Sequence, residues 1–157
     1  MSIGSISGLQ VLNLFNNSLA GGIPSSMGKL KNLQKLDLRI NKLNSTIPPE
    51  LGLCTDLIYL ALAVNSLSGE LPWTLSNLKS MAELGLSDNK LSGELSSISS
   101  PTGPGWSHCN FKTNRFCGVI PQEIRHMTKL QLPFLYGNGF NGSIPLEIGN
   151  LIGPNQL

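Results

Sequence analysis

The sequence predicts an α/β solenoid, a right-handed superhelix with a parallel β-sheet on its concave face and short 3₁₀ or loop segments on its convex face. Three observations predict it. A pattern of apolar residues recurs every 24 residues, an asparagine recurs at one position of that pattern, and a glycine- and proline-containing segment follows most of these asparagines. Self-similarity with a period of roughly 20 to 50 residues is typical of repeat architectures.

The repeat is clearest between Leu57 and Pro72, where its fixed positions read LxxLxLxxNxLxGxLP. The pattern restarts at intervals of 24 residues, with one extra residue before the fifth start. The starts are Leu9, Leu33, Leu57, Met81, Trp106 and Leu130. Residues 1–157 are therefore expected to form a single domain of about six coils. No end cap is recognisable and both ends fall inside a repeat, so we expect a fragment or a truncated gene product.

Each coil opens with a segment in which apolar and polar positions alternate, as in a half-buried strand. In the first coil, Leu12 and Leu14 are expected to point into the core, and Val11, Asn13 and Phe15 to point outward. Stacking the coils would place these strands about 4.8 Å apart in a parallel sheet. The inward leucines would then form one continuous core.

The recurring asparagine follows each strand, where the chain leaves the sheet and its backbone groups lose their strand partners. An amide side chain donates and accepts hydrogen bonds together, so a stacked file of asparagines can satisfy these groups between coils. We predict this structural role, rather than ligand binding, for Asn17, Asn41, Asn65, Asn89, Asn114 and Asn138.

The second half of a coil, as in Leu19–Pro24, supplies a glycine and then a proline that closes an extended segment. Apolar residues at a spacing of three then predict a short 3₁₀ turn on the convex side. Three glycines in these turns can take a left-handed conformation: Gly28, Gly52 and Gly149. Ser45 replaces the first glycine of its coil, and Ser96 replaces the proline of its coil.

The fifth coil departs most from the pattern, because residues 96–105 replace the convex segment with serine, glycine and proline and add one residue. Cys109 also stands in the place of a core leucine, so we expect this coil to be the least stable. Two interpretations stay open. The segment is a functional loop, or it records compensating frameshifts between about Ser100 and Asn114, since a shifted frame can restore the core leucines.

Composition excludes several function classes. Charged residues make up only 13% of the chain and the net charge is +2, so the basic patch of a nucleic-acid-binding protein is absent. The longest apolar run, Leu57–Val64, is far shorter than the roughly 18 residues of a membrane-spanning helix. Met1–Ser5 has neither the basic start nor the apolar stretch of a signal peptide.

No catalytic or metal-binding pattern is recognisable. His108 and His126 have no nucleophile or carboxylate at motif spacing, and the three cysteines, Cys54, Cys109 and Cys117, have no metal-ligand spacing. Cys54 occupies a core position, where a buried thiol serves as a small apolar side chain. We therefore expect no enzyme activity, no cofactor and no metal.

The sequence favours a binding function over catalysis, because side chains at the outward strand positions do not pack in the core. They form three columns: Val11, Lys35, Tyr59, Glu83, His108, Leu132; then Asn13, Asp37, Ala61, Gly85, Asn110, Phe134; then Phe15, Arg39, Ala63, Ser87, Lys112, Tyr136. Aromatic residues and arginine dominate binding hot spots. The candidate ligand-binding residues are Phe15, Lys35, Asp37, Arg39, Tyr59, Lys112, Phe134 and Tyr136. Small residues beside them predict a trough wide enough for an extended peptide: Ala61, Ala63, Gly85 and Ser87.

The pattern LxGxIP, in Leu19–Pro24, Phe116–Pro121 and Phe140–Pro145, is typical of the plant-specific class of leucine-rich repeats. The chain therefore resembles the ectodomains of plant leucine-rich repeat receptor-like kinases over nearly its whole length. The resemblance implies an extracellular, glycosylated domain that binds a peptide, a steroid or a partner such as a co-receptor ectodomain on its concave or lateral face. The membrane helix, the kinase domain and the paired cap cysteines of that family are not in this sequence.

Three Asn-x-Ser/Thr triplets predict glycosylation at Asn16, Asn44 and Asn141. Three alternative functions stay open: a secreted inhibitor resembling polygalacturonase-inhibiting proteins, an ice-binding protein, and a non-functional remnant. Ice binding would need a flat, regular array of Ser, Thr or Asn, and the outward columns are irregular.

Overall fold

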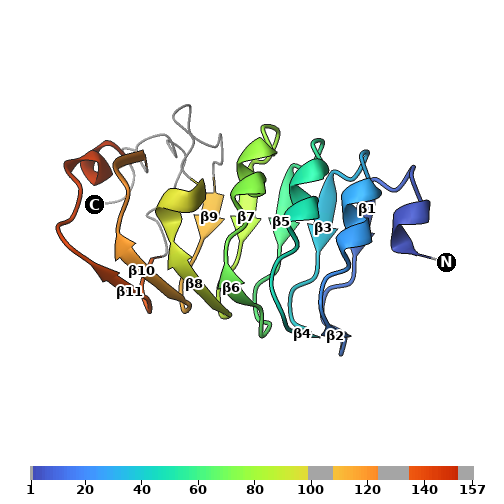
Figure 1. The fold of residues 1–157 in the computed structure, drawn as a ribbon, viewed down its shortest axis with the longest axis horizontal. Helices are drawn as coiled ribbons and strands as arrows, with labels where there is room; N and C mark the ends of the chain where they lie inside the picture. Colours follow the sequence, from blue (N-terminus) through green and yellow to red (C-terminus); the bar gives the residue numbers. More distant parts are fainter. Residues whose placement is uncertain (1, 99–107, 124–134, 152–157) are drawn as a thin grey trace.

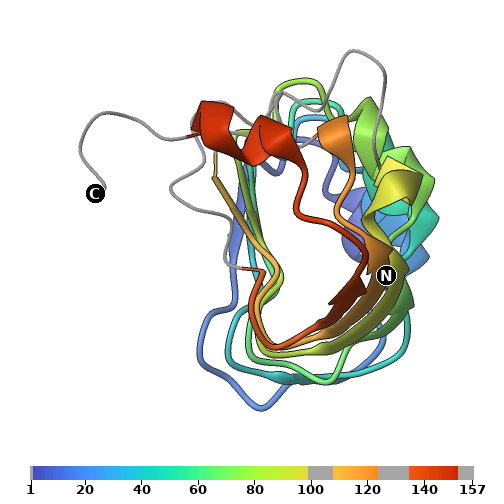
Figure 2. The ribbon, with the colours of Figure 1, turned by 90° about the vertical axis from the view of Figure 1, so that its left-hand side faces the viewer.

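The computed structural model describes residues 2–98, 108–123 and 135–151. Its coils stack along the long axis, with residues 3–5 at one end of the stack and residues 139–151 at the other (Figure 1). Seen along the stack, the coils nearly superimpose (Figure 2). We number them from the predicted starts: coil one, 9–32; coil two, 33–56; coil three, 57–80; coil four, 81–105; coil five, 106–129; coil six, 130–153.

The predicted concave sheet is confirmed. Five parallel strands follow one another in the order β1-β3-β5-β7-β9. They are β1 (Val11–Asn13), β3 (Lys35–Asp37), β5 (Tyr59–Ala61), β7 (Glu83–Gly85) and β9 (His108–Asn110). Equivalent residues of neighbouring coils pair, as Lys35 does with Tyr59, and Glu83 pairs with His108 across the extra residue of coil four. Within the paired strands, successive residues of an outward column are therefore neighbours on one face of the sheet.

A second sheet, which we call the lateral sheet, is not predicted by the sequence pattern. Its four-stranded part has the order β11-β10-β8-β6, and a separate pair joins β2 to β4. The strands are β2 (Ala20–Gly21), β4 (Lys42–Leu43), β6 (Ser68–Glu70), β8 (Lys90–Glu94), β10 (Arg115–Val119) and β11 (Gly139–Asn141). Short segments with a central glycine carry little strand signal, so only the adjacent coil reveals the pairing.

The convex side carries the predicted 3₁₀ helices. They are η1 (Ile3–Ser5), η2 (Ser25–Lys29), η3 (Pro49–Leu53), η4 (Trp73–Asn77), η5 (Leu95–Ile98) and η7 (Leu146–Leu151). Pro24, Pro48 and Pro72 lie just before three of them with φ of −66°, −69° and −65°. Proline fixes this angle, so it ends the extended segment and sets the direction of the turn.

The expected left-handed conformation of Gly28, Gly52 and Gly149 is wrong, since none of them has a positive φ. At Gly28 and Gly52 the lack of a side chain serves close packing instead. A Cβ on Gly28 would overlap the carbonyl oxygen of Glu50, and one on Gly52 would overlap that of Thr74. Glycine at these positions lets neighbouring 3₁₀ helices approach closely.

The core runs continuously from coil one into coil five. Leu36, Leu60 and Leu84 are almost completely buried, as predicted. Cys54 is also buried, and its Sγ donates to the Met27 carbonyl oxygen at 3.2 Å. Burial raises the pKa of the Cys54 thiol, which suits the predicted apolar role.

Five of the six recurring asparagines bond to the coil before their own, whereas the Asn17 Nδ2 donates only to oxygens of its own coil. The Asn41 Nδ2 donates to the Leu14 oxygen of the coil before, at 3.0 Å, and to the Leu38 oxygen of its own coil, at 3.1 Å. The Asn41 Oδ1 accepts from the Leu19 N–H, 3.0 Å away. The same set of contacts recurs at Asn65, Asn89, Asn114 and Asn138. Each side chain thus ties two coils together.

Candidate functional site

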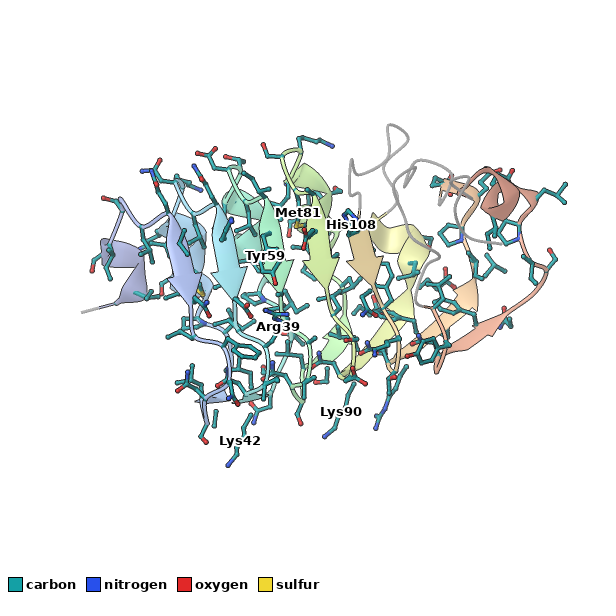
Figure 3. All side chains as sticks on the ribbon, turned by 180° about the vertical axis from the view of Figure 1, so that it is seen from behind. Arg39, Lys42, Tyr59, Met81, Lys90 and His108 are labelled. Atoms are coloured by element: carbon teal, nitrogen blue, oxygen red, sulfur yellow. The ribbon has the colours of Figure 1, made fainter. Side chains whose placement is uncertain are left out.

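A hollow of about 280 Å³ opens on the concave face over β5, β7 and β9. We call it the concave trough. Its floor includes the predicted small residues: Ala61, Ala63, Gly85 and Ser87. Its walls include larger polar side chains: Arg39, Tyr59, Glu83, His108 and Asn110. Figure 3 shows Arg39, Tyr59 and His108 on this face, with Lys42 and Lys90 extending away from the lower edge.

The floor is low because its side chains are small. Ala61 and Ser87 point out of the core yet are only 3% and 4% exposed, since taller neighbours shade them. A Cβ added to Gly85 would lie 3.8 Å from the Ala61 Cα, an ordinary contact, so the backbone at Gly85 is open from above. An extended backbone can approach such a floor closely.

One end of the trough is formed by an ion pair that is itself stacked on an aromatic ring. The Arg39 Nη2 lies 2.6 Å from the Asp37 Oδ2, and the Arg39 Nε lies 3.0 Å from the Asp37 Oδ1. The Arg39 guanidinium carbon lies 5.1 Å from the centre of the Phe15 ring, within cation–π range. The side chain of Arg39 is thereby held in one orientation.

Asp37 carries the charge that balances Arg39. Burial raises the pKa of the Asp37 carboxyl, but hydrogen bonds from the Arg39 side chain and backbone N–H outweigh burial and leave that pKa lowered. The hydrogen bond to Asp37 raises the pKa of Arg39. Asp37 is only 8% exposed, so it is less accessible to a ligand than its outward position predicts.

Beyond the residues that line the trough, coil five carries a second cation above an aromatic ring. The Lys112 Nζ lies 5.8 Å from the centre of the Tyr136 ring. Within residues 2–98, 108–123 and 135–151, no carboxylate lies within ion-pair distance of Lys112. The third column thus reads aromatic, cation, small, small, cation, aromatic, but only its coil-two cation is neutralised.

The structure divides the other predicted residues between two hollows. Lys35 and Asp37 line a smaller one of about 150 Å³ over β1 and β3, and Tyr59 borders both hollows. Burial raises the pKa of the Tyr59 hydroxyl. Glu83 and His108 stand in the predicted columns but are not singled out by the sequence, because only their register beside Tyr59 marks them. Phe134, Leu132 and His126 lie outside the described residues.

Other chemistry is limited in the part of the chain that the structure describes. It contains no group of three or more His, Cys, Asp or Glu side chains that could hold a metal ion. None of its helices has the length and apolar character needed to cross a membrane. The three predicted glycosylation sites, Asn16, Asn44 and Asn141, are all exposed.

Comparisons with known proteins agree with this architecture. A family model described as Leucine Rich Repeat matches residues 8–30 and 32–54. No curated protein sequence matches the chain. Among solved structures, the plant peptide hormone receptor RGFR1 in complex with RGF2 is 34% identical with a TM-score of 0.89, over 95% of this chain and 24% of the receptor. This chain therefore spans about a quarter of the length of that receptor.

Two further structures bear on function. The leucine-rich repeat ectodomain of the receptor kinase SOBIR1 from Arabidopsis thaliana is 32% identical with a TM-score of 0.77, over 85% of this chain and 72% of that one. A plant ice-binding protein is 26% identical with a TM-score of 0.81, over 98% of this chain and 48% of that one.

Proposed function

We propose that this chain is a non-catalytic module that binds an extended peptide in its concave trough, because it belongs to the leucine-rich repeat family of plant receptor-kinase ectodomains. The observation that carries this proposal is a floor of small residues between two cation–aromatic pairs. RGFR1, which shares this fold, is a peptide hormone receptor in complex with RGF2.

The dimensions of the trough favour a short extended segment. Arg39 and Lys112 lie in coils two and five, three strand spacings of about 4.8 Å apart, or roughly 14 Å. An extended chain advances about 3.3 Å per residue, so roughly four residues span the distance between the two cations. The low floor gives the peptide backbone access to Gly85.

Charge sets the direction of the peptide. Arg39 in coil two is paired with Asp37, whereas Lys112 in coil five has no carboxylate within ion-pair distance among the described residues. An acidic group of the ligand is therefore expected beside Lys112. Because Arg39 is held by Asp37, its remaining N–H groups suit a neutral acceptor such as a peptide carbonyl oxygen.

Peptide binding can be tested without knowing the natural ligand. A displayed library of random 12-residue peptides is selected on the wild-type protein, and the enriched peptides are synthesised and titrated. We expect Gly85→Arg, which fills the floor, to weaken their binding at least ten-fold. Gly8→Arg is the matched control, because Gly8 is exposed, has open space around it and lies outside the trough. The proposal fails if no peptide is enriched, or if Gly85→Arg binds as tightly as Gly8→Arg.

We also propose that the module is extracellular and that Asn16, Asn44 and Asn141 carry glycans, as their exposure allows. Expression of the chain behind a secretion signal in plant cells, followed by deglycosylation, tests this. Loss of mass at each asparagine, and none in the Asn→Gln variants, is expected. An unmodified secreted chain would contradict the glycan assignment.

Ice binding is the second candidate, because a plant ice-binding protein shares the fold. Charged side chains, Lys35 and Glu83, interrupt the outward concave column. We therefore expect no inhibition of ice recrystallisation, and inhibition at micromolar protein would favour this function instead.

A further inference from the structure

The concave face repeats one hydrogen bond between a side chain and the backbone in three of the coils. In coils one, two and five, the backbone N–H of the third outward column donates to a side-chain oxygen two residues earlier, in the second outward column. The pairs, with N···O distances of 3.0, 3.1 and 3.2 Å, are Phe15 with Asn13, Arg39 with Asp37, and Lys112 with Asn110. An amide or carboxylate oxygen therefore satisfies this N–H in each of them.

Coils three and four cannot form this bond. Ala61 and Gly85 occupy the second column there, and neither has a side-chain oxygen. Among residues 2–98, 108–123 and 135–151, no acceptor is hydrogen-bonded to the Ala63 N–H or to the Ser87 N–H. A backbone donor that is shielded from water and has no partner costs about as much free energy as a lost hydrogen bond, so such donors are rare.

Both donors belong to the concave trough. Ala63 and Ser87 line it on adjacent coils, one strand spacing of about 4.8 Å apart. Ala63 is half-buried and Ser87 is buried. The space above the second column is open at Gly85, since a Cβ there would make only ordinary contacts with Ala61, at 3.8 and 3.9 Å. The trough therefore has room for an oxygen atom of a ligand beside these N–H groups.

We propose that the Ala63 N–H and the Ser87 N–H bind a carboxylate or carboxamide oxygen of the peptide that occupies the trough. This inference rests on the proposed function. The ligand oxygen would take the place that the Asp37 Oδ1 holds in coil two and the Asn110 Oδ1 holds in coil five. The chemistry of the occupant thus follows from the side chains with which other coils fill the same position.

The small residues of the floor then serve two purposes. Ala61 and Gly85 lower the floor so that a peptide can approach, and the same two residues leave the N–H groups of the third column without an internal acceptor. A bound peptide that lacks the oxygen would cover these donors without satisfying them. We therefore expect such a peptide to bind at least ten-fold more weakly.

The uncapped donor can be tested in the protein without any ligand. Amide hydrogen exchange followed by NMR is expected to be at least ten-fold faster at Ala63 than at Arg39, whose N–H is bonded. Ala61→Asn supplies the missing acceptor and is expected to slow exchange at Ala63 to the rate of Arg39. Ala61→Leu is the matched control, because leucine is of similar size and has no oxygen. Equal exchange rates at Ala63 in the two variants would overturn the proposal.

The ligand oxygen is tested with the synthesised peptides from the library selection. In one arm each Asp, Asn, Glu or Gln of the peptide is replaced by alanine, and in the other the carboxyl terminus is moved away by a glycine extension. On binding of the parent peptide, the amide proton resonances of Ala63 and Ser87 are expected to move downfield. One arm should weaken binding at least ten-fold and abolish this shift, and it identifies a side chain or the terminal carboxylate as the source of the oxygen.

The remaining outcomes separate this inference from the proposed function. If the peptides depend on Gly85 but neither arm weakens binding, or if the Ala63 and Ser87 resonances do not move, the oxygen subsite is overturned while the proposed function stands. If Gly85→Arg binds as tightly as Gly8→Arg, or if no peptide is enriched, both are overturned.

Discussion

Coil four and coil five carry different side chains at equivalent core positions. Coil four places Leu84 in β7, Leu86 just after β7 and Leu91 in β8, and all three are buried. Coil five places Cys109, Phe111 and Phe116 at these positions. The two phenylalanine rings meet edge to face, with centres 5.8 Å apart and planes at 89°, and each is almost fully buried.

The backbone pairing and the asparagine contacts are the same in both coils, although the core side chains differ. Cys109 pairs with Leu84 as Leu84 pairs with Leu60, and Asn114 makes the same four contacts as Asn89. A coil therefore requires its backbone hydrogen bonds and a well-packed core. Leucine is not required at every core position, because other apolar side chains of suitable total volume can pack there.

Removal of a buried aromatic ring from coil five is expected to cause the largest loss of stability. Phe116→Ala is expected to lower the free energy of unfolding by about 3–5 kcal/mol, because it leaves a cavity beside Phe111. Urea unfolding measures the change. A loss below about 1 kcal/mol would show that coil five is loosely packed, unlike coil four.

The asparagine file should matter more inside the stack than at its end. Asn89→Ala leaves the Leu62 and Leu86 oxygens and the Leu67 N–H without this partner, so we expect a loss of about 2–3 kcal/mol. Asn17→Ala is the matched control, since the Asn17 side chain contacts only oxygens of its own coil among the described residues. Its loss is expected to be below about 1 kcal/mol. Equal losses would contradict the bridging role.

Giving coil five the residues of coil four tests whether the volumes are equivalent. Cys109→Leu, Phe111→Leu and Phe116→Leu together are expected to change the free energy of unfolding by less than about 1.5 kcal/mol, because total volume is nearly conserved. The singles Phe111→Leu and Phe116→Leu should each cost about 1–2 kcal/mol, since the neighbours stay shaped for rings. Additive losses in the triple variant would disprove the equivalence.

Coil two differs from coil five at one position of the lateral segment. Ser45 has φ of 73° where the equivalent Gly118 has φ of 74°. Ser45→Gly is expected to raise the free energy of unfolding by about 0.5–1 kcal/mol, because glycine adopts this angle without strain. Gly118→Ser should lower it by a similar amount, and thermal unfolding of both variants checks the signs.

The smallest expected effect concerns charge. Coil two pairs Asp37 with Arg39, whereas coil five has the neutral Asn110 beside Lys112. Because the pKa of Asp37 is lowered in the folded state, its stabilisation is present above the ordinary value of 3.8 and is lost as the pH falls through the folded value. Asp37→Asn should cost about 0.5 kcal/mol at pH 7 and nothing near pH 2. A gap that persists at pH 2 would refute the assignment.

How far the site could be predicted depends on the residue. The columns placed Lys35 beside Tyr59 and Asp37 beside Ala61, because parallel pairing in strict register follows from the repeat length. The columns did not reveal that Asp37 is engaged by Arg39, or that Tyr59 separates two hollows, because side-chain rotamers and concave shading are not encoded in spacing. The positive φ of Ile40 and Val64 could not be predicted from the spacing either, because the turn that the coils share sets this angle.

By itself, the sequence determined the solenoid, the concave sheet, the inward leucines and the asparagine file. Each depends on a contact between equivalent residues of adjacent coils, and a repeated pattern states such contacts directly. The tertiary structure alone decided the lateral sheet, the close helix contacts at Gly28 and Gly52, and the ring pair of coil five. These depend on distances between non-equivalent atoms, which exist only once the coils are stacked.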